Sequence, residues 1–450
     1  MNPMESIKKY GLEQAFNYLY KDPEKNLLKI MDWADKFAGG EFVRQRKQIR
    51  EAIENPEHPY NNYILHIIHD IDPEVMKTMA VNFFINAAMM GWPKQEANRK
   101  KYNCNIPWTI LMDPTSACNL HCTGCWAAEY GHKLNLTFDE MDKVVTQGKE
   151  LGVYLYMFTG GEPLVRKADL VKLCEKHSDC AFLAFTNGTL VDEAFCADLK
   201  RIGNLYLAIS LEGFSEVNDL RRGTGVFAKV MHAMDLLKEN GLVFGTSICY
   251  TSKNYKTVTS DEFIDMIVEK GCRYALYFHY MPVGNDASLE LLPNPKQRLY
   301  IKDRVREIRN MTSGKGIFTM DFQNDGEFVG GCIAGGRNYF HINANGDAEP
   351  CVFIHYSGAN IRTHSMLEIL KQPLFMAYHD NQPFNENHYR PCPMLENPEI
   401  LQRLVKETGA KSTDLQSPES AEHLCNKCKE YAQAWKPCAD KLWAEEGHSN

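Results

Sequence analysis

The chain of 450 residues lacks the features that would place it in several common classes. No stretch approaches the roughly 20 consecutive apolar residues of a spanning helix, so we expect no transmembrane segment. Met1–Leu28 carries charges throughout and has no apolar segment before a small-residue cleavage site, which predicts no signal peptide and a cytoplasmic location. No low-complexity tract or repeat of fixed period is found, and 44% hydrophobic with 24% charged residues is typical of an ordinary globular protein.

An excess of positive charge is also missing. Lys and Arg together number 50 against 58 Asp and Glu, which gives a net charge of -8. Nothing resembles the clustered basic stripe that binds phosphate backbones. We therefore expect no nucleic-acid partner.

Cysteine, in contrast, is abundant. The chain has 15 cysteines, and because the cytosol keeps thiols reduced, metal binding or redox chemistry is a better explanation for them than disulfides. Nine of them fall into two groups along the sequence. The other six have no partner at metal-ligand spacing and are interpreted as small core residues: Cys104, Cys174, Cys180, Cys196, Cys249 and Cys272.

Residues 1–103 predict an appended helical region, because apolar residues recur there at spacings of three and four. The predicted helices are Ser6–Tyr20, Glu24–Lys36, Glu41–Asn55 and Pro73–Met90. The most apolar run, Met79–Trp92, is too short to span a membrane. We expect a buried core helix there, with a membrane-surface or lipid-facing segment as the alternative.

Residues 104–313 alternate short β-rich runs with amphipathic helices, which is typical of βα units around a parallel sheet. The predicted strands are Thr109–Met112, Tyr154–Phe158, Ala181–Phe185, Leu205–Ile209, Phe244–Tyr250 and Tyr274–Tyr280. The predicted helices are Thr137–Leu151, Ala168–His177, Asp192–Arg201, Val226–Asn240 and Asp261–Lys270. Six units are too few to close an eight-stranded barrel, so we expect an α/β fold with a partial (β/α)6 barrel and a site at the strand carboxyl ends.

Residues 314–450 no longer show this alternation of strands and helices and are rich in Gly, Pro, Asn and cysteine. Six cysteines without regular helical or strand spacing predict a C-terminal domain organised by a bound metal group.

The first cysteine group follows the first predicted strand. Cys118, Cys122 and Cys125 form a Cys-x3-Cys-x2-Cys triplet within one short loop. Three thiolates leave one iron of a cubane cluster open to a further ligand, whereas four would close it. A zinc site is the alternative, although zinc ligands usually come as two separated Cys-x2-Cys pairs.

This triplet resembles the signature of the radical S-adenosylmethionine (radical SAM) superfamily. The resemblance implies a site-differentiated 4Fe-4S cluster that binds S-adenosyl-L-methionine (SAM) and cleaves it to a 5′-deoxyadenosyl radical, which abstracts hydrogen from the substrate. The position before the third cysteine is commonly aromatic in that superfamily, but here it is Gly124. Trp126 is the candidate to supply the missing surface beside adenine.

Further cofactor-binding residues are implied by the same resemblance. Gly160, Gly161 and Glu162 match the GGEP motif that holds the methionine amino group, and a carboxylate can accept hydrogen bonds from an ammonium group. Strand-end residues expected near the ribose and carboxylate of SAM are Thr186, Asn187, Ser210 and Glu212. Arg222 is the candidate partner of the methionine carboxylate, since guanidinium groups bind carboxylates in a bidentate manner.

The second cysteine group resembles the SPASM type of auxiliary-cluster domain. Cys332 and Cys351 flank a hairpin predicted at Ile342–Asp347, followed by Cys392, Cys425, Cys428 and Cys438. Six cysteines cannot fully ligate two clusters. The resemblance therefore implies one complete auxiliary 4Fe-4S cluster, with Cys332, Cys351, Cys425 and Cys428 as preferred ligands, or two if one has a ligand other than cysteine. A zinc ribbon at the same cysteines is the alternative.

Together these features predict an enzyme of the radical SAM superfamily, either an oxidoreductase or one that forms C–C or C–S bonds. The resemblance implies an electron donor such as flavodoxin or ferredoxin and, first, a peptide or protein substrate. A lipid-like or small-molecule substrate is the alternative, favoured by the apolar run before Trp92. A non-catalytic iron-sulfur or zinc-binding scaffold is the alternative of another class. The sequence singles out no catalytic acid or base.

Overall fold

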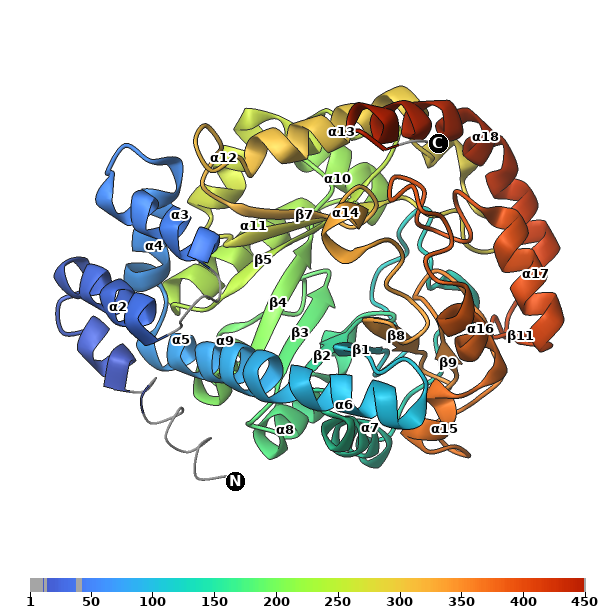
Figure 1. Ribbon diagram of the computed structural model, residues 1–450, viewed down its shortest axis with the longest axis horizontal. Helices are drawn as coiled ribbons and strands as arrows, with labels where there is room; N and C mark the ends of the chain where they lie inside the picture. Colours follow the sequence, from blue (N-terminus) through green and yellow to red (C-terminus); the bar gives the residue numbers. More distant parts are fainter. Residues whose placement is uncertain (1–10, 12–13, 38–42, 449–450) are drawn as a thin grey trace.

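The computed structural model describes residues 11, 14–37 and 43–448 (Figure 1). Its main feature is a sheet of nine strands in the order β7-β6-β5-β4-β3-β2-β1-β8-β9. All neighbouring strands are parallel except β8 and β9. The strands are β1 (Thr109–Met112), β2 (Leu155–Phe158), β3 (Ala181–Thr186), β4 (Leu205–Ser210), β5 (Phe244–Tyr250), β6 (Tyr274–His279), β7 (Phe318–Asp321), β8 (Tyr339–Ile342) and β9 (Ala348–Glu349). A separate antiparallel pair joins β10 (Tyr356–Ser357) to β11 (Lys411–Ser412).

Helices alternate with the first six strands, as the sequence predicts. The five predicted helices are α7 (Phe138–Leu151), α8 (Lys167–Lys176), α9 (Glu193–Ile202), α11 (Val226–Glu239) and α12 (Asp261–Glu269). A further helix, α10 (Ser215–Arg222), was not predicted. The ends of these helices follow local chemistry. For example, Thr137 and Glu140 form a capping box at the start of α7, and Gly152 ends that helix with a φ of 100°.

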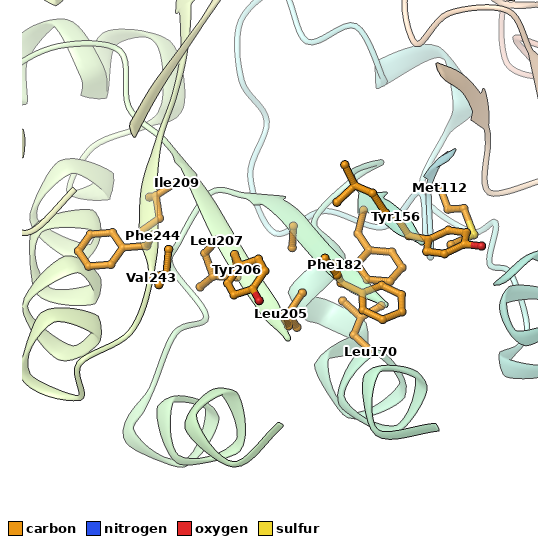
Figure 2. Packing of buried hydrophobic residues seen from close by; sticks show 14 of the residues in the cluster. Met112, Tyr156, Leu170, Phe182, Leu205, Tyr206, Leu207, Ile209, Val243 and Phe244 are labelled. Atoms are coloured by element: carbon orange, nitrogen blue, oxygen red, sulfur yellow. The ribbon is translucent and has the colours of Figure 1, made fainter. Parts of the chain in front are cut away.

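The core lies between the sheet and these helices. Figure 2 shows Tyr156 and Phe182, from the neighbouring strands β2 and β3, close to Leu170 of α8. The rings of Tyr156 and Phe182 stack with centroids 5.7 Å apart, and all three side chains are fully buried. This packing fixes β2 and β3, whose carboxyl ends carry functional loops.

The predicted α/β fold with a partial barrel is confirmed, and all six predicted strands are present, but the sheet extends beyond them to nine strands. β7 and β8 belong to the region where the βα pattern was expected to end, yet β7 pairs with β6, and β8 pairs with β1 in parallel. The partner of β8 precedes it by more than 200 residues, so no local pattern indicates the pairing. The sheet thus crosses the predicted boundary at residue 313, and the domain limits at 103 and 313 remain predictions.

The N-terminal part is helical, with α2 (Pro23–Phe37), α3 (Val43–Glu54), α4 (Pro59–Asp70), α5 (Pro73–Ala80), the π-helical segment η1 (Val81–Gly91) and α6 (Trp92–Tyr102). The beginning of the predicted helix Ser6–Tyr20 lies outside the described residues. α5, η1 and α6 form one unbroken helix whose Asn82 donates to the carbonyl oxygen of Cys180, directly before β3. One face of η1 is therefore buried, as the core-helix interpretation requires. No helix in the described part of the chain is long and apolar enough to cross a membrane.

The C-terminal part contains more helix than the sequence indicated. Its helices are α13 (Pro295–Ile308), α14 (Gly326–Val329), α15 (Met366–Leu370), α16 (Pro373–Asn381), α17 (Pro398–Thr408) and the 25-residue α18 (Ala421–Glu445). Short helical turns complete the fold at η2 (Ala128–Tyr130), η3 (Pro163–Arg166), η4 (Thr257–Thr259) and η5 (Leu289–Leu291). The predicted hairpin is present, since β8 and β9 pair on either side of the turn at 343–347.

Candidate functional site

A cavity opens where the carboxyl ends of the barrel strands meet the loop after β1. It is lined by Leu111, Cys118, Leu120, Cys122, Gly124, Cys125, Trp126, Thr159, Gly160, Gly161, Glu162, Phe185, Thr186, Asn187, Ser210, Arg221, Arg222, Ser247, Cys249, Phe278, His279, Tyr280, Met281, Val352 and Phe353. The cavity therefore brings together the cysteine triplet and all but one of the predicted cofactor-binding residues. The exception is Glu212, which lies directly behind the wall.

The three cysteines of the triplet share this cavity. Backbone hydrogen bonds hold their loop at both ends: Glu162 N donates to Ala117 O at 2.8 Å, and Thr123 N donates to Arg221 O at 3.0 Å. Burial raises the pKa of the Cys118 thiol to about 11. Metal binding here would therefore release protons from thiols that are otherwise neutral.

Gly160 and Gly161 allow two loops to approach closely. A Cβ atom at Gly161 would lie 2.2 Å from Ala117 O and 2.5 Å from Ser116 O. A Cβ atom at Gly160, where φ is 104°, would lie 2.5 Å from Thr115 O. These glycines thus set the position of the segment that leads into Cys118.

Glu162 is buried and connects the GGEP loop to the end of β3. Its carboxylate accepts hydrogen bonds from Thr186 Oγ1 at 2.6 Å, Asn187 N at 2.7 Å and Leu164 N at 2.9 Å. Burial raises the pKa of Glu162, and these donors oppose the shift. The predicted role toward an ammonium group remains a prediction, but the residue also braces two cavity loops.

Glu212 forms a buried cluster with the two arginines at the end of α10. Arg221 Nη1 and Arg222 Nη2 lie 2.7 Å and 2.5 Å from Glu212 Oε1, while Glu212 Oε2 has no hydrogen-bond partner among the described residues. Arg222 Nη1 also lies 3.9 Å from Cys122 Sγ. Arg222 therefore lines the cavity beside the triplet, and because both arginines share the single carboxylate of Glu212, the cluster keeps one positive charge that no carboxylate of the described residues balances.

Tyr280 is a cavity residue that the sequence did not single out. Gly124 has a φ of 67°, and a Cβ atom there would lie 2.8 Å from the Tyr280 ring. An aromatic ring thus occupies the space next to position 124, but it comes from the end of β6. Trp126, the predicted substitute, packs edge-on against His341, Phe353 and other rings at the C-terminal side of the cavity. The proposed contact of Trp126 with adenine was based only on the position of Trp126 next to the triplet, and it stays a prediction.

The second cysteine group lies in a separate core in the C-terminal part. Cys332, Cys351, Cys392 and Cys425 pack in this core together with the buried Tyr378. Tyr339 donates to Cys351 Sγ at 2.7 Å. Burial raises the pKa of Cys351 to about 11 and that of Cys332 to about 12.

The remaining cysteines of this group lie on α18, not on a second hairpin. Cys425 and Cys428 are buried one turn apart, and Cys438 packs against the same core. The zinc-ribbon alternative required two cysteine-bearing hairpins, so the helix argues against it. Cys392, which was not among the preferred ligands, packs against the same core as Cys332 and Cys351.

A buried network of ionisable groups links the two cysteine-bearing parts. His341 on β8 lies 2.8 Å from Asp113 Oδ1, directly after β1, and 2.6 Å from Glu349 Oε2 on β9. Burial opposes charge on His341, but the two carboxylates outweigh it and raise its pKa to about 10. Tyr130 also donates to Glu349, at 2.8 Å. This imidazolium fastens the triplet-bearing strand to the hairpin that carries Cys351.

Comparison with known proteins decides the family. Residues 112–268 match the radical SAM superfamily, and residues 332–394 match the SPASM iron-sulfur cluster-binding domain. The chain contains a radical SAM domain and a SPASM domain. The radical SAM domain binds a 4Fe-4S cluster and SAM, and the SPASM domain binds auxiliary iron-sulfur clusters.

The relatives of this chain are distant. The Fe-coproporphyrin III synthase of Methanosarcina barkeri is 26% identical over 49% of this chain and 57% of its own length. The AdoMet-dependent heme synthase of the same organism is 23% identical over 76% of this chain and 94% of its own. The structure of Streptococcus suis SuiB bound to the precursor peptide SuiA shares the fold, with a TM-score of 0.54 and 19% identity over 64% of this chain and 70% of that chain.

The residues present fit the cofactors of both domains, the 4Fe-4S cluster with SAM and the auxiliary iron-sulfur cluster. In the radical SAM domain, three thiols from one loop face the cavity, and directly behind its wall Glu212 keeps one carboxylate oxygen without a hydrogen-bond partner among the described residues. In the SPASM domain, Tyr378 is fully buried, its hydroxyl has no hydrogen-bond partner among the described residues, and the cysteines of the second group pack in the same core. A buried hydroxyl is costly to leave unpaired, so its placement suits a sulfur-rich group held by these cysteines.

Proposed function

We propose that Cys118, Cys122 and Cys125 hold the SAM-cleaving cluster, and that this cavity performs hydrogen abstraction from the substrate. When bound there, the cluster supplies one electron to SAM, whose cleavage yields the 5′-deoxyadenosyl radical. Gly160 and Gly161 position the cysteine loop, and Glu162 braces it against β3. The single observation that carries the proposal is the convergence of the triplet, the GGEP loop and Arg222 on one cavity.

The test is anaerobic reconstitution followed by reduction in the presence of SAM. Wild type should form 5′-deoxyadenosine, and the triple variant Cys118→Ala, Cys122→Ala, Cys125→Ala should form none. A matched variant with Cys174, Cys180 and Cys272 changed to Ala removes three buried cysteines that lie outside both groups. Equal activity of the triplet variant and wild type would refute the assignment.

The lining of the cavity favours a substrate with a hydrocarbon part. Apolar side chains form much of its wall, including Leu111, Phe185, Met281 and Phe353. Phe278 also stacks on Phe322 with centroids 4.4 Å apart. A peptide backbone would bring amide and carbonyl groups that lose free energy against such a wall unless they find partners. The proposed first class is therefore a lipid-like or other amphiphilic small molecule.

A peptide or protein is the second candidate. Its support is the fold shared with SuiB, whose structure was solved with a precursor peptide. Perdeuterated substrates separate the two classes, because abstraction transfers deuterium from the substrate to 5′-deoxyadenosine. Transfer from deuterated acyl lipids and none from a deuterated peptide digest supports the first class, and the reverse supports the second. An electron donor such as flavodoxin or ferredoxin belongs to either proposal.

A further inference from the structure

The segments α5, η1 and α6 form one continuous helix (Figure 1). This helix exposes several apolar side chains. Phe84 is 58% exposed, Met89 47% and Trp92 43%. Their spacing places them along one face of this π-helical and helical segment. The buried face is fixed by Asn82 and by Gln95, which donates to Gly152 O at 2.7 Å. The exposed apolar face is therefore not turned inward in the folded chain.

A hollow of about 460 Å³ continues this face toward α14. It is lined by Trp92, Arg99, Asn105, Phe328, Val329, Arg337 and Asn338. Phe328 is 69% exposed, and Val329 is exposed beside it. Isolated exposed apolar residues are ordinary, but a contiguous group rimmed by charge indicates an interaction surface.

The charge at this surface is positive although the whole chain is acidic. The Arg337 guanidinium donates to the carbonyl oxygens of Val329, Gly330 and Cys332, and no carboxylate of the described residues lies within ion-pair distance of it. The Arg99 guanidinium stacks 4.9 Å from the centre of the Trp92 ring. Burial and the charge of Arg99 both lower the pKa of Arg337. The hollow therefore contains an arginine whose charge no carboxylate balances.

Basic residues extend from the hollow along α6. This helix carries Lys94, Arg99, Lys100 and Lys101 against a single acidic residue, Glu96. Glu96 pairs with Arg99, which leaves the lysines as unbalanced charge. Exposed aromatic side chains flanked by lysine and arginine match the headgroup region of an anionic bilayer, where aromatic rings lie at the interface and each basic residue contributes about 1 kcal/mol.

We propose that this face, defined by Phe84, Met89, Trp92, Phe328 and the basic residues of α6, docks on an anionic lipid bilayer. The occupant is argued from charge complementarity: basic residues outnumber acidic ones beside the apolar side chains, since α6 carries four basic residues against Glu96 alone. The helix packs against residues that directly precede β2 and β3. The docking face therefore lies near the amino ends of these strands, whereas the cysteine loop lies at the carboxyl ends. The proposal does not depend on the substrate class, and its test measures no turnover.

The test is co-sedimentation of the full chain with vesicles of phosphatidylcholine alone or with about one third phosphatidylglycerol. We expect binding to the anionic vesicles, weakened as salt rises from about 0.1 to about 0.5 M. The pair Trp92→Ser with Phe328→Ser, and the pair Lys100→Glu with Lys101→Glu, should each lower the partition coefficient at least tenfold. Circular dichroism checks the fold, and Phe328→Ser alone, at a strongly exposed site, is the variant least able to disturb it.

The matched control is Leu415→Ser with Lys411→Glu, which removes an exposed apolar and an exposed basic residue beside β11. It should bind like wild type. Three outcomes would overturn the proposal: no binding to anionic vesicles, equal binding to neutral ones, or equal losses in the control and the two test pairs. A protein partner on this face would give the first of these results.

Discussion

Tyr378 has an unpaired hydroxyl and lies in the core that also contains Cys332, Cys351, Cys392 and Cys425. In protein without clusters, Tyr378→Phe should therefore leave folding stability unchanged or raise it, by up to about 1–3 kcal/mol, the cost of an unsatisfied buried polar group. Chemical denaturation under anaerobic, chelating conditions measures this. Tyr206→Phe is the control, because Tyr206 is also buried but donates to Gly203 O, and its removal should destabilise. Equal losses in both variants would show that Tyr378 is paired.

In reconstituted protein the same substitution should act differently. Hydrogen bonds to cluster sulfurs favour the more negatively charged reduced state, so their loss lowers the reduction potential. Tyr378→Phe should keep the iron content and shift the auxiliary cluster to a lower potential in a redox titration followed by electron paramagnetic resonance. An unchanged potential would assign Tyr378 a packing role alone.

Individual site residues were predictable where the chemistry is local in sequence. The triplet, Gly160, Gly161 and Glu162 are adjacent in short loops, and the structure places them around one cavity. Tyr280 was not predictable, because it meets Gly124 only through the fold. The pairing of Arg222 with Glu212 was missed for a similar reason. The sequence shows the two charges, but α10, the helix that brings Arg222 back to Glu212, was not predicted.

The loop at Gly160 and Gly161 lies very close to the segment 115–117, which leads into Cys118. Gly161→Ala would place a Cβ atom 2.2 Å from Ala117 O, so the segment before Cys118 must move. We expect a loss of about 1–3 kcal/mol in folding stability, the usual cost of overpacking, together with reduced iron retention by the triplet. Gly358→Ala is the control, since a Cβ atom there meets its nearest neighbour at 3.5 Å. Normal iron content and stability in Gly161→Ala would contradict this account of the glycine pair.

Strand β8 pairs with β1, and its His341 contacts Asp113 and Glu349. The stabilisation from these two contacts should depend on pH. Because the folded-state pKa of His341 is about 10, above the ordinary 6.5, its stabilising charge is present below pH 6.5 and is lost as pH rises toward 10. The free energy of unfolding of wild type should therefore fall, relative to that of His341→Gln, by several kcal/mol between pH 7 and pH 10. Denaturation of cluster-free protein at a series of pH values measures this difference. A constant difference would mean that His341 is neutral in the folded chain.

Elements with a complete local signal were predicted well. The six predicted strands match β1 to β6 to within one residue at each end, because each is a short apolar run between turn residues. α18, the longest single α-helix described, was missed because its cysteines were interpreted as metal ligands in an irregular region, although Cys425 and Cys428 are part of its buried face. β8 was missed because its pairing with β1 depends on distant sequence.

At the scale of the molecule, one sheet connects both cysteine groups. β1 leads into the triplet loop, β8 pairs with β1, and the β8–β9 hairpin leads to Cys351. The two cysteine groups are therefore connected to the same sheet and do not lie in domains joined only by a linker. This arrangement suits electron transfer between the two sites, which requires a fixed separation.

Cys351→Ala tests whether the second group serves that transfer. SAM cleavage needs only the barrel cavity, so uncoupled 5′-deoxyadenosine formation should persist, while substrate turnover should fall to background and iron content should drop by about four per chain. Loss of a ligand could instead unfold the C-terminal core. Circular dichroism and the spectrum of the barrel cluster distinguish unfolding from a specific defect, and Cys272→Ala, a buried cysteine outside both groups, controls for thiol removal. A folded Cys351→Ala protein that lacks auxiliary iron but converts substrate normally would show that the second site is structural.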